Sequence, residues 1–165
     1  MDPWITPNLI GRHVRLESLC MNHADALRAA AADGALWTVR YTSVPGPEAG
    51  EVETYIDAAR DAGHALPFAV LDASDALVGT ARFYDIDPSV PRVKLGYTWY
   101  AQRVQRTALN SEAKLLLIEH AFADGHCPSW RQARRCAART DAPSRRQLAR
   151  HGGVFDSFRR VAVIA

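Results

Sequence analysis

The chain has 165 residues, of which 48% are apolar and 23% are charged, and its formal net charge at pH 7 is +2. This length predicts a single domain over residues 1–165, and the composition is that of an ordinary soluble globular protein. No apolar run approaches the roughly 20 residues that a membrane-spanning helix needs, and the first residues lack the basic start and apolar stretch of a secretion signal, so a cytoplasmic protein is expected.

The first part of the chain predicts one strand followed by two helices. Residues 13–19 alternate polar and apolar side chains, which is the pattern of a half-buried strand. Residues 22–34 are rich in alanine and end in glycine, which predicts a short helix. Residues 47–63 begin with a proline, carry an apolar stripe at helical spacing and end in glycine, so a second helix is predicted there.

From residue 67 onward, the apolar period changes to that of strands. Residues 67–71 and 77–84 flank a turn-like segment and predict a hairpin, and residues 93–100 predict a further strand. The helix that follows has apolar side chains on more than one face, so it must be largely buried against the sheet. The order β-α-α-β-β-β-α over residues 13–123 predicts the α/β fold class, with a mixed sheet covered by helices.

A polar crossing without glycine joins the last predicted strand to this helix. It consists of Gln105, Arg106, Thr107, Ala108, Leu109 and Asn110. Thr107 is the N-cap candidate. The first N–H groups of a helix lack internal partners and carry partial positive charge, so the amides after Thr107 could bind an anion beside Arg106. The alternative is an ordinary helix start that binds only water, and these residues alone favour it.

The crossing and its flanks resemble the cofactor turn of the GNAT superfamily of N-acetyltransferases. In the family pattern Gln/Arg-x-x-Gly-x-Gly/Ala, Gln105 takes the first place, Ala108 the first Gly and Asn110 the Gly/Ala. The wider match is to the RimJ/RimL-like branch, which acetylates the N-termini of ribosomal proteins. It covers about residues 4–126 and rests on LIGRHVRLESL at 9–19, PFAV at 67–70, ARFYDI at 81–86 and LGYTWYAQRVQRTALNSEAKLLL at 95–117.

The resemblance implies a GNAT fold that binds acetyl-CoA, needs no metal, and transfers acetyl to a primary amine by direct attack. The amine would be a protein N-terminus or a small molecule such as a polyamine or a drug. One strand would pair with pantetheine and polarise the thioester through a backbone N–H, and the crossing would bind the pyrophosphate. An alanine at 108 is acceptable if that residue already has helical dihedrals. The implied cofactor-binding residues are Tyr97, Thr98, Trp99, Gln105, Arg106, Thr107, Ala108, Leu109 and Asn110.

Acetyl transfer needs a neutral amine and a proton for the leaving thiolate, and four side chains are candidates for these roles. Glu112 stands where the resembling branch also has Glu and is a candidate base, although compensation of the helix dipole is the favoured role there. Asp85, at a strand end, is an equal candidate for the base or a simple turn former. Tyr84 or Tyr100 could protonate the thiolate, but a buried tyrosine is more often a core residue.

The resemblance weakens after residue 126. The family pattern has a fifth strand, an Asn-containing loop and a final helix with a Tyr, whereas residues 127–139 are rich in Arg and lack apolar alternation. The expected Asn is absent, and Leu148 stands near the place of the Tyr. Residues 127–165 are therefore either divergent or altered by small insertions, deletions or a change of reading frame, and the second explanation is slightly favoured.

Two other classes stay open. The first is a non-catalytic acyl-CoA-binding or interaction protein, a degenerate relative with a disrupted last third. The second and weaker one is RNA association, because residues 128–165 carry 9 basic and 2 acidic side chains but few interleaved aromatic ones. Cys20, Cys127 and Cys136 have neither zinc-ligand nor disulfide spacing. The acceptor and the oligomeric state, with a homodimer among the alternatives, are left undetermined.

Overall fold

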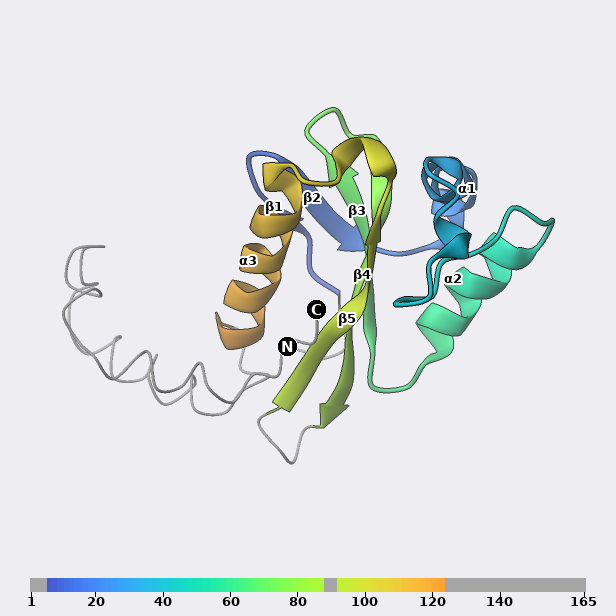
Figure 1. The fold of residues 1–165 in the computed structure, drawn as a ribbon. Helices are drawn as coiled ribbons and strands as arrows, with labels where there is room; N and C mark the ends of the chain where they lie inside the picture. Colours follow the sequence, from blue (N-terminus) through green and yellow to red (C-terminus); the bar gives the residue numbers. More distant parts are fainter. Residues whose placement is uncertain (1–5, 88–91, 124–165) are drawn as a thin grey trace, which may run out of the picture.

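The structure is a computed structural model that describes residues 6–87 and 92–123 (Figure 1). The described strands form one sheet in the order β1-β2-β3-β4-β5, in which every neighbouring pair is antiparallel. The strands are β1 (Leu9–Ile10), β2 (Val14–Ser18), β3 (Leu66–Asp72), β4 (Leu77–Asp87) and β5 (Arg92–Tyr100). The α-helices are α1 (Ala24–Ala32), α2 (Glu51–Asp61) and α3 (Ala108–Ala123), and short 3₁₀ turns lie at Met21–His23, Leu36–Thr38 and Gln102–Val104.

The predicted α/β class and the order β-α-α-β-β-β-α are confirmed, with the two-residue strand β1 as an addition. The predicted mixed sheet is wrong for the described strands, which are all antiparallel, because β3, β4 and β5 follow one another through short connections instead of crossover helices. Helices α1 and α2 cover one face of the sheet, and α3 covers the other (Figure 1). The fifth family strand and final helix, about which the sequence was ambiguous, fall in residues 124–165, outside the described residues. Within the described part of the chain, no helix has the length and apolar character that crossing a membrane requires.

The helix boundaries differ from the predicted ones where the backbone requires it. The helix predicted over residues 47–63 begins only at Glu51, because Gly50 has a φ of +84° and cannot continue an α-helix. The helix predicted over residues 22–34 begins at Ala24 after a 3₁₀ turn and ends before Gly34, whose φ is +95°. Both helices are therefore shorter than their apolar patterns suggested.

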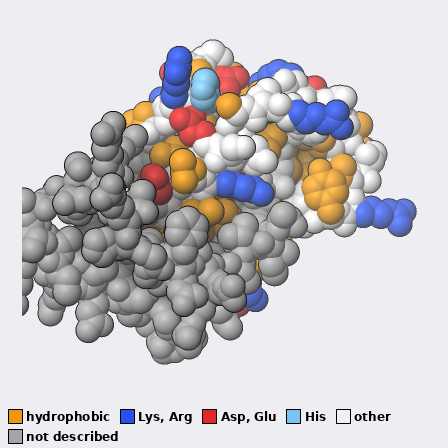
Figure 2. All heavy atoms as spheres, turned by 60° about the vertical axis from the view of Figure 1, so that its left-hand side comes forward, with side chains coloured by type: hydrophobic (Ala, Val, Ile, Leu, Met, Phe, Trp, Pro, Cys, Tyr) orange, Lys and Arg blue, Asp and Glu red, His pale blue; other side chains and the backbone are white. Residues whose placement is uncertain are grey.

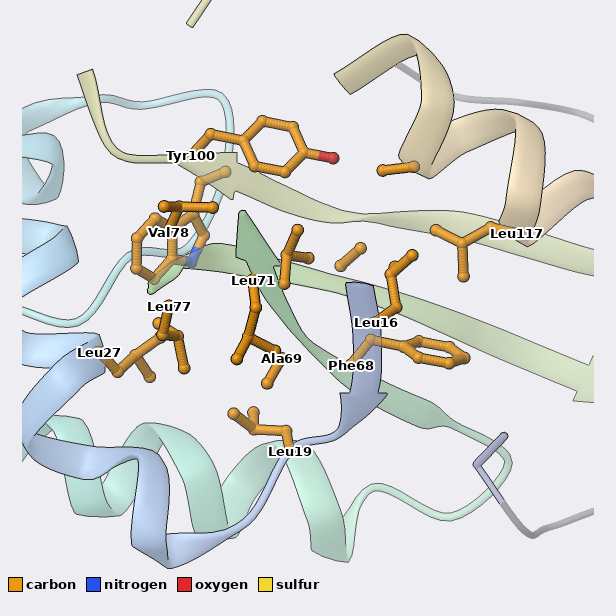
Figure 3. Close-up of a cluster of buried hydrophobic side chains, with 14 of the residues drawn as sticks. Leu16, Leu19, Leu27, Phe68, Ala69, Leu71, Leu77, Val78, Tyr100 and Leu117 are labelled. Atoms are coloured by element: carbon orange, nitrogen blue, oxygen red, sulfur yellow. The ribbon is translucent and has the colours of Figure 1, made fainter. Parts of the chain in front are cut away.

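The core fills the space between the sheet and the helices on both of its faces. Phe68 of β3 and Phe83 of β4 are fully buried, and their rings meet edge to face with centroids 5.5 Å apart. Leu117 of α3, Leu27 of α1 and Ile56 of α2 are buried as well, and Figure 3 shows part of this cluster. Each such side chain contributes about 1.5–3 kcal/mol on burial. This packing holds α3 against the sheet and so determines where its first turn lies.

Strands β4 and β5 approach each other closely at Gly79. This residue lies opposite Tyr100, and a Cβ atom in its place would collide with the backbone carbonyl oxygen of Trp99. Only glycine allows the two backbones to come this close. The contact therefore fixes the position of the C-terminal half of β5 against its neighbour.

A β-bulge interrupts the pairing of these strands just beyond that contact. Thr80 pairs with Trp99, but Arg82 pairs with Gly96, so two residues of β5 lie opposite one residue of β4. Tyr97, one of the two, has a φ of +50°, a conformation that non-glycine residues seldom adopt. A bulge bends its strand and redirects side chains. It therefore shapes the edge of β5, which is the last strand of the described sheet.

Candidate functional site

A cavity of about 690 Å³ runs along β5 to the beginning of α3. Residues 95–100 of β5 form one wall, with Tyr84 of the neighbouring strand β4. Residues 40–43, in the loop before α2, form a second wall. The third wall surrounds the start of α3 and comprises Gln105, Arg106, Asn110 and Lys114. The fold thus brings together three segments that are far apart in the sequence.

The structure places most of the predicted cofactor-binding residues in this cavity. From the predicted set, its lining includes Tyr97, Thr98, Trp99, Gln105, Arg106 and Asn110. The three residues between Arg106 and Asn110, namely Thr107, Ala108 and Leu109, line a separate shallow hollow together with His13 and Asp72. The crossing therefore contributes its two ends to the cavity and its middle to another surface.

The start of α3 is well defined although it lacks glycine. The N–H of Leu109 donates to Thr107 Oγ1 at 3.4 Å, so the N-cap prediction for Thr107 is confirmed. Ala108 is the first residue of the helix, which explains why alanine suffices there. The left-handed conformation that would favour glycine lies instead at Arg106, whose φ is +61°. The turn is therefore built with a strained arginine that lines the cavity.

The charges around the cavity are of one sign. Arg40, Arg106 and Lys114 line it, and no Asp or Glu of the described residues does. None of these three cations forms an ion pair within the described ranges. On the side that carries α3, basic side chains lie apart from one another rather than in one continuous patch (Figure 2). A concave site lined by cations that have no ion pair among the described residues attracts an anionic ligand.

Three polar atoms of the lining residues are buried and have no hydrogen-bond partner among the residues that the structure describes. They are Thr42 Oγ1, the Tyr100 hydroxyl and Asn110 Oδ1. Tyr100 is only 8% exposed, and this burial raises the pKa of its hydroxyl well above the ordinary value. Its backbone is fixed because Gln105 Nε2 donates to the Tyr100 carbonyl oxygen at 2.9 Å. Native proteins leave few buried polar groups unpaired, and a role in catalysis or a bound water or ion is the usual explanation.

A chain of hydrogen bonds connects the bulge of β5 to α2. Trp99 Nε1 lies 3.3 Å from the Tyr55 hydroxyl, which lies 2.9 Å from Thr80 Oγ1. Thr80 Oγ1 in turn donates to the Tyr97 carbonyl oxygen at 3.4 Å. The guanidinium of Arg82 lies over the Tyr97 ring, 4.4 Å from its centroid. Backbone and side chain of Tyr97 are therefore both held in place.

Glu112, the predicted base, is engaged elsewhere. Its carboxylate accepts the N–H of Arg12 at 2.8 Å and the N–H of His13 at 2.6 Å. These two bonds, with the one from Arg12 the stronger influence, lower the pKa of Glu112. It does not line the cavity, so this geometry gives no support to Glu112 as a base. Its carboxylate instead ties the N-terminal half of α3 to the turn between β1 and β2.

The other two predicted catalytic residues are separated by the structure. Asp85 lies outside the cavity at a second register shift of β4 and forms an ion pair with Lys94, whose Nζ is 2.7 Å from Asp85 Oδ2. Tyr84 lines the cavity, and its ring meets the Tyr97 ring edge to face with centroids 5.2 Å apart. Of the four predicted candidates for proton transfer, Tyr84 and Tyr100 line the cavity, whereas Glu112 and Asp85 do not.

The sequence analysis missed two parts of the lining. The loop 40–43 reaches the cavity only through the fold, and no local pattern marks it. Lys114 follows Asn110 by four residues, a spacing that places both on one face of a helix, so this signal was present in the sequence. In the described part of the chain, no group of three or more His, Cys, Asp or Glu side chains is arranged to hold a metal ion.

Comparisons with known proteins agree with this architecture. Residues 13–154 match the family model for an acetyltransferase (GNAT) domain. No curated protein sequence matches the chain. A GCN5-related N-acetyltransferase from Brucella melitensis is 28% identical with a TM-score of 0.61; the match covers 74% of this chain but only 60% of that protein's length.

A second solved structure is more distant in sequence. It is an acetyl transferase from Salmonella typhimurium that modifies the N-terminal serine of the 50S ribosomal subunit protein L7/L12. The identity is 17%, the TM-score is 0.59, and the match covers 73% of this chain and 71% of that protein. At this identity the likeness concerns the fold alone.

Proposed function

The chain belongs to the GNAT acetyltransferase domain family, and on this basis we propose that it binds acetyl-CoA and transfers the acetyl group to a primary amine. The observation that carries the proposal is the cationic cavity between the bulged edge of β5 and the first turn of α3. A cytoplasmic enzyme of the RimJ/RimL-like branch is the most specific form of this proposal.

The residues present fit acetyl-CoA. Arg106 and Lys114 supply positive charge beside the N-terminal end of α3, where a phosphate group is favoured by unpaired N–H groups and by the helix dipole. The outer edge of β5 offers backbone groups to an extended chain such as pantetheine, in the manner of an added strand. We therefore assign the phosphates to the α3 side of the cavity and the thioester to the bulge.

The chemistry needs little from side chains. The lone pair of a neutral amine attacks the thioester carbonyl carbon, the carbon–sulfur bond breaks, the nitrogen gives up one proton, and the sulfur takes up one. Backbone N–H groups of β5 would stabilise the charge that develops on the carbonyl oxygen. Cations around the cavity disfavour the protonated amine and so lower its pKa, which raises the fraction of nucleophile. Tyr84, which faces the cavity, is the side chain assigned to protonate the sulfur.

The charge of the cavity also bears on the acceptor. A polyamine would bring several positive charges beside Arg40, Arg106 and Lys114, and like charges repel. A peptide N-terminus followed by neutral or acidic residues avoids this repulsion. We therefore propose a protein N-terminus as the acceptor, in keeping with the sequence segments shared with the RimJ/RimL-like branch.

Binding and turnover test the proposal separately. Acetyl-CoA should raise the Tm of the purified chain by mass action. At a concentration of 100 times Kd, it should add about 2.7 kcal/mol to the free energy of unfolding. Release of free CoA should then require an amine, and a peptide with a free N-terminus should be acetylated faster than spermidine. The same peptide with an acetylated N-terminus is the control. Binding without release would favour the non-catalytic alternative, and no binding would overturn both.

A further inference from the structure

The conformation of Tyr97 must be maintained by its surroundings. Its φ of +50° is one that residues with a side chain keep only when neighbouring groups hold them. Tyr97 lies in the bulge, lines the cavity, and is 41% exposed. The position of this one residue therefore decides how the backbone of β5 faces a ligand.

The hydrogen bonds between Trp99, Tyr55, Thr80 and Tyr97 have one consistent direction. The indole N–H of Trp99 can only donate, so the Tyr55 hydroxyl accepts from it and donates to Thr80 Oγ1. The Thr80 hydroxyl then donates to the Tyr97 carbonyl oxygen. The Tyr55 and Thr80 hydroxyls thus each accept one hydrogen bond and donate one. Thr80 is only 2% exposed, so no exchange with bulk water competes with these bonds.

The last bond orients a peptide plane. In a trans peptide the C=O of one residue and the N–H of the next point in opposite directions. Because the Tyr97 carbonyl faces Thr80, the N–H of Thr98 is turned away from Thr80, and Thr98 lines the cavity. Rotation of this plane would move the N–H with it. The hydroxyl of Thr80 therefore restrains the orientation of this peptide plane in the cavity wall.

We propose that Tyr55, although it lies outside the cavity, is a positioning residue for acetyl transfer, because through Thr80 it fixes the peptide plane between Tyr97 and Thr98. The inference rests on the proposed function, in which this part of β5 meets the thioester. Tyr55 touches neither substrate in this arrangement. Its effect on the reaction is expected to pass through Thr80, whose hydroxyl contacts the Tyr97 carbonyl oxygen.

The test separates positioning from stability. In Tyr55→Phe, which keeps the ring and loses the hydroxyl, kcat should fall about tenfold, because a displaced donor stabilises the transition state less well. The Kd for acetyl-CoA should change less than about twofold, since the phosphate contacts on α3 are untouched. Thr80→Val should have the same effect as Tyr55→Phe. Thr80→Ser, which restores the hydroxyl, should recover most of the rate.

The control is Thr54→Val on the same helix. The Thr54 hydroxyl donates to the Gly50 carbonyl oxygen of its own helix at 2.7 Å and does not line the cavity, so its loss should leave kcat unchanged. Equal kcat values for Thr80→Val and Thr80→Ser, or an unchanged kcat in Tyr55→Phe with a lowered Tm, would overturn the inference and leave a merely structural role. Failure of the wild-type chain to bind acetyl-CoA would overturn the proposed function instead.

Discussion

The polar groups of two adjacent segments differ in their hydrogen bonding. In the bulge, the Tyr97 carbonyl oxygen and the Trp99 indole N–H are both bonded, through Thr80 and Tyr55. At the end of β5 and the start of α3, the Tyr100 hydroxyl and Asn110 Oδ1 have no partner among the described residues. Paired groups make a rigid wall, and unpaired groups and cations remain available to a ligand. One cavity thus has a fixed wall, the bulge of β5 with its paired groups, and a free wall, formed by the end of β5 and the start of α3, whose groups can bind a ligand.

The largest effect is expected where the fixed wall meets β4. In Gly79→Ala, the new Cβ would collide with the Trp99 carbonyl oxygen, and no side-chain rotation can relieve a contact with backbone. We expect a loss of about 3 kcal/mol in the free energy of unfolding, measured by urea denaturation.

Gly63→Ala is the matched control, because a Cβ at Gly63 meets nothing within 4 Å. It should leave the midpoint nearly unchanged. A similar small effect in both variants would show that β4 and β5 are not held as closely as this contact implies.

The second effect concerns the other wall. Arg106→Glu combined with Lys114→Glu replaces two cations of the cavity by anions. We expect the Kd for acetyl-CoA to rise by about 100-fold or more, because charge-assisted bonds to phosphate are lost and repulsion replaces them. The Tm without ligand should not fall, since neither cation has an ion pair within the described ranges. Isothermal titration calorimetry and a thermal scan measure the two quantities.

An unchanged Kd in this double variant would mean that the phosphates bind elsewhere. Arg103→Glu is the matched control, because Arg103 precedes the same turn but pairs with Asp33 at 3.2 Å and does not line the cavity. It should lower the Tm and leave the Kd nearly unchanged.

The sequence predicted the fixed elements better than the site they form. Apolar periodicity identified β2 to β5 and all three α-helices because burial imposes it. It could not place the loop 40–43 in the cavity, since that contact depends on the whole fold. Glu112 shows the same limit: the family resemblance suggested a base, but its partners are backbone amides about 100 residues earlier in the chain. Every residue except proline carries a backbone N–H, so no sequence pattern indicates which of these groups binds a side chain.

The third effect is a pH dependence of the Tm. It arises from the Glu112 brace, the two hydrogen bonds that the Glu112 carboxylate accepts from the N–H groups of Arg12 and His13. The N–H groups of Arg12 and His13 hold the pKa of Glu112 below its ordinary value of 4.5. A lowered pKa in the folded state means that the stabilisation is complete above pH 4.5 and is lost as the pH falls through the folded-state pKa. Glu112→Gln should therefore lower the Tm by a few degrees at pH 7, and the difference from the wild type should shrink in acid.

The exposed Glu119, on the same helix, provides the control for this measurement. Glu119→Gln should change the Tm little at either pH, because a solvated carboxylate gains little from folding. A difference between wild type and Glu112→Gln that stays constant down to pH 3 would show that the carboxylate charge does not stabilise the brace.

The smallest effect compares the same chemical change on the two walls. Tyr55→Phe removes a paired hydroxyl and should cost about 1 kcal/mol of stability, whereas Tyr100→Phe removes one without a described partner and should cost nothing or add a few tenths. Figure 3 shows the Tyr100 hydroxyl directed toward α3, and its raised pKa keeps it protonated at neutral pH, so the comparison is free of a charge change. Urea denaturation without ligand measures both. If Tyr100→Phe destabilised the chain as much as Tyr55→Phe, the Tyr100 hydroxyl would be paired in the folded chain. The difference between the fixed wall and the free wall would then hold only for the cations.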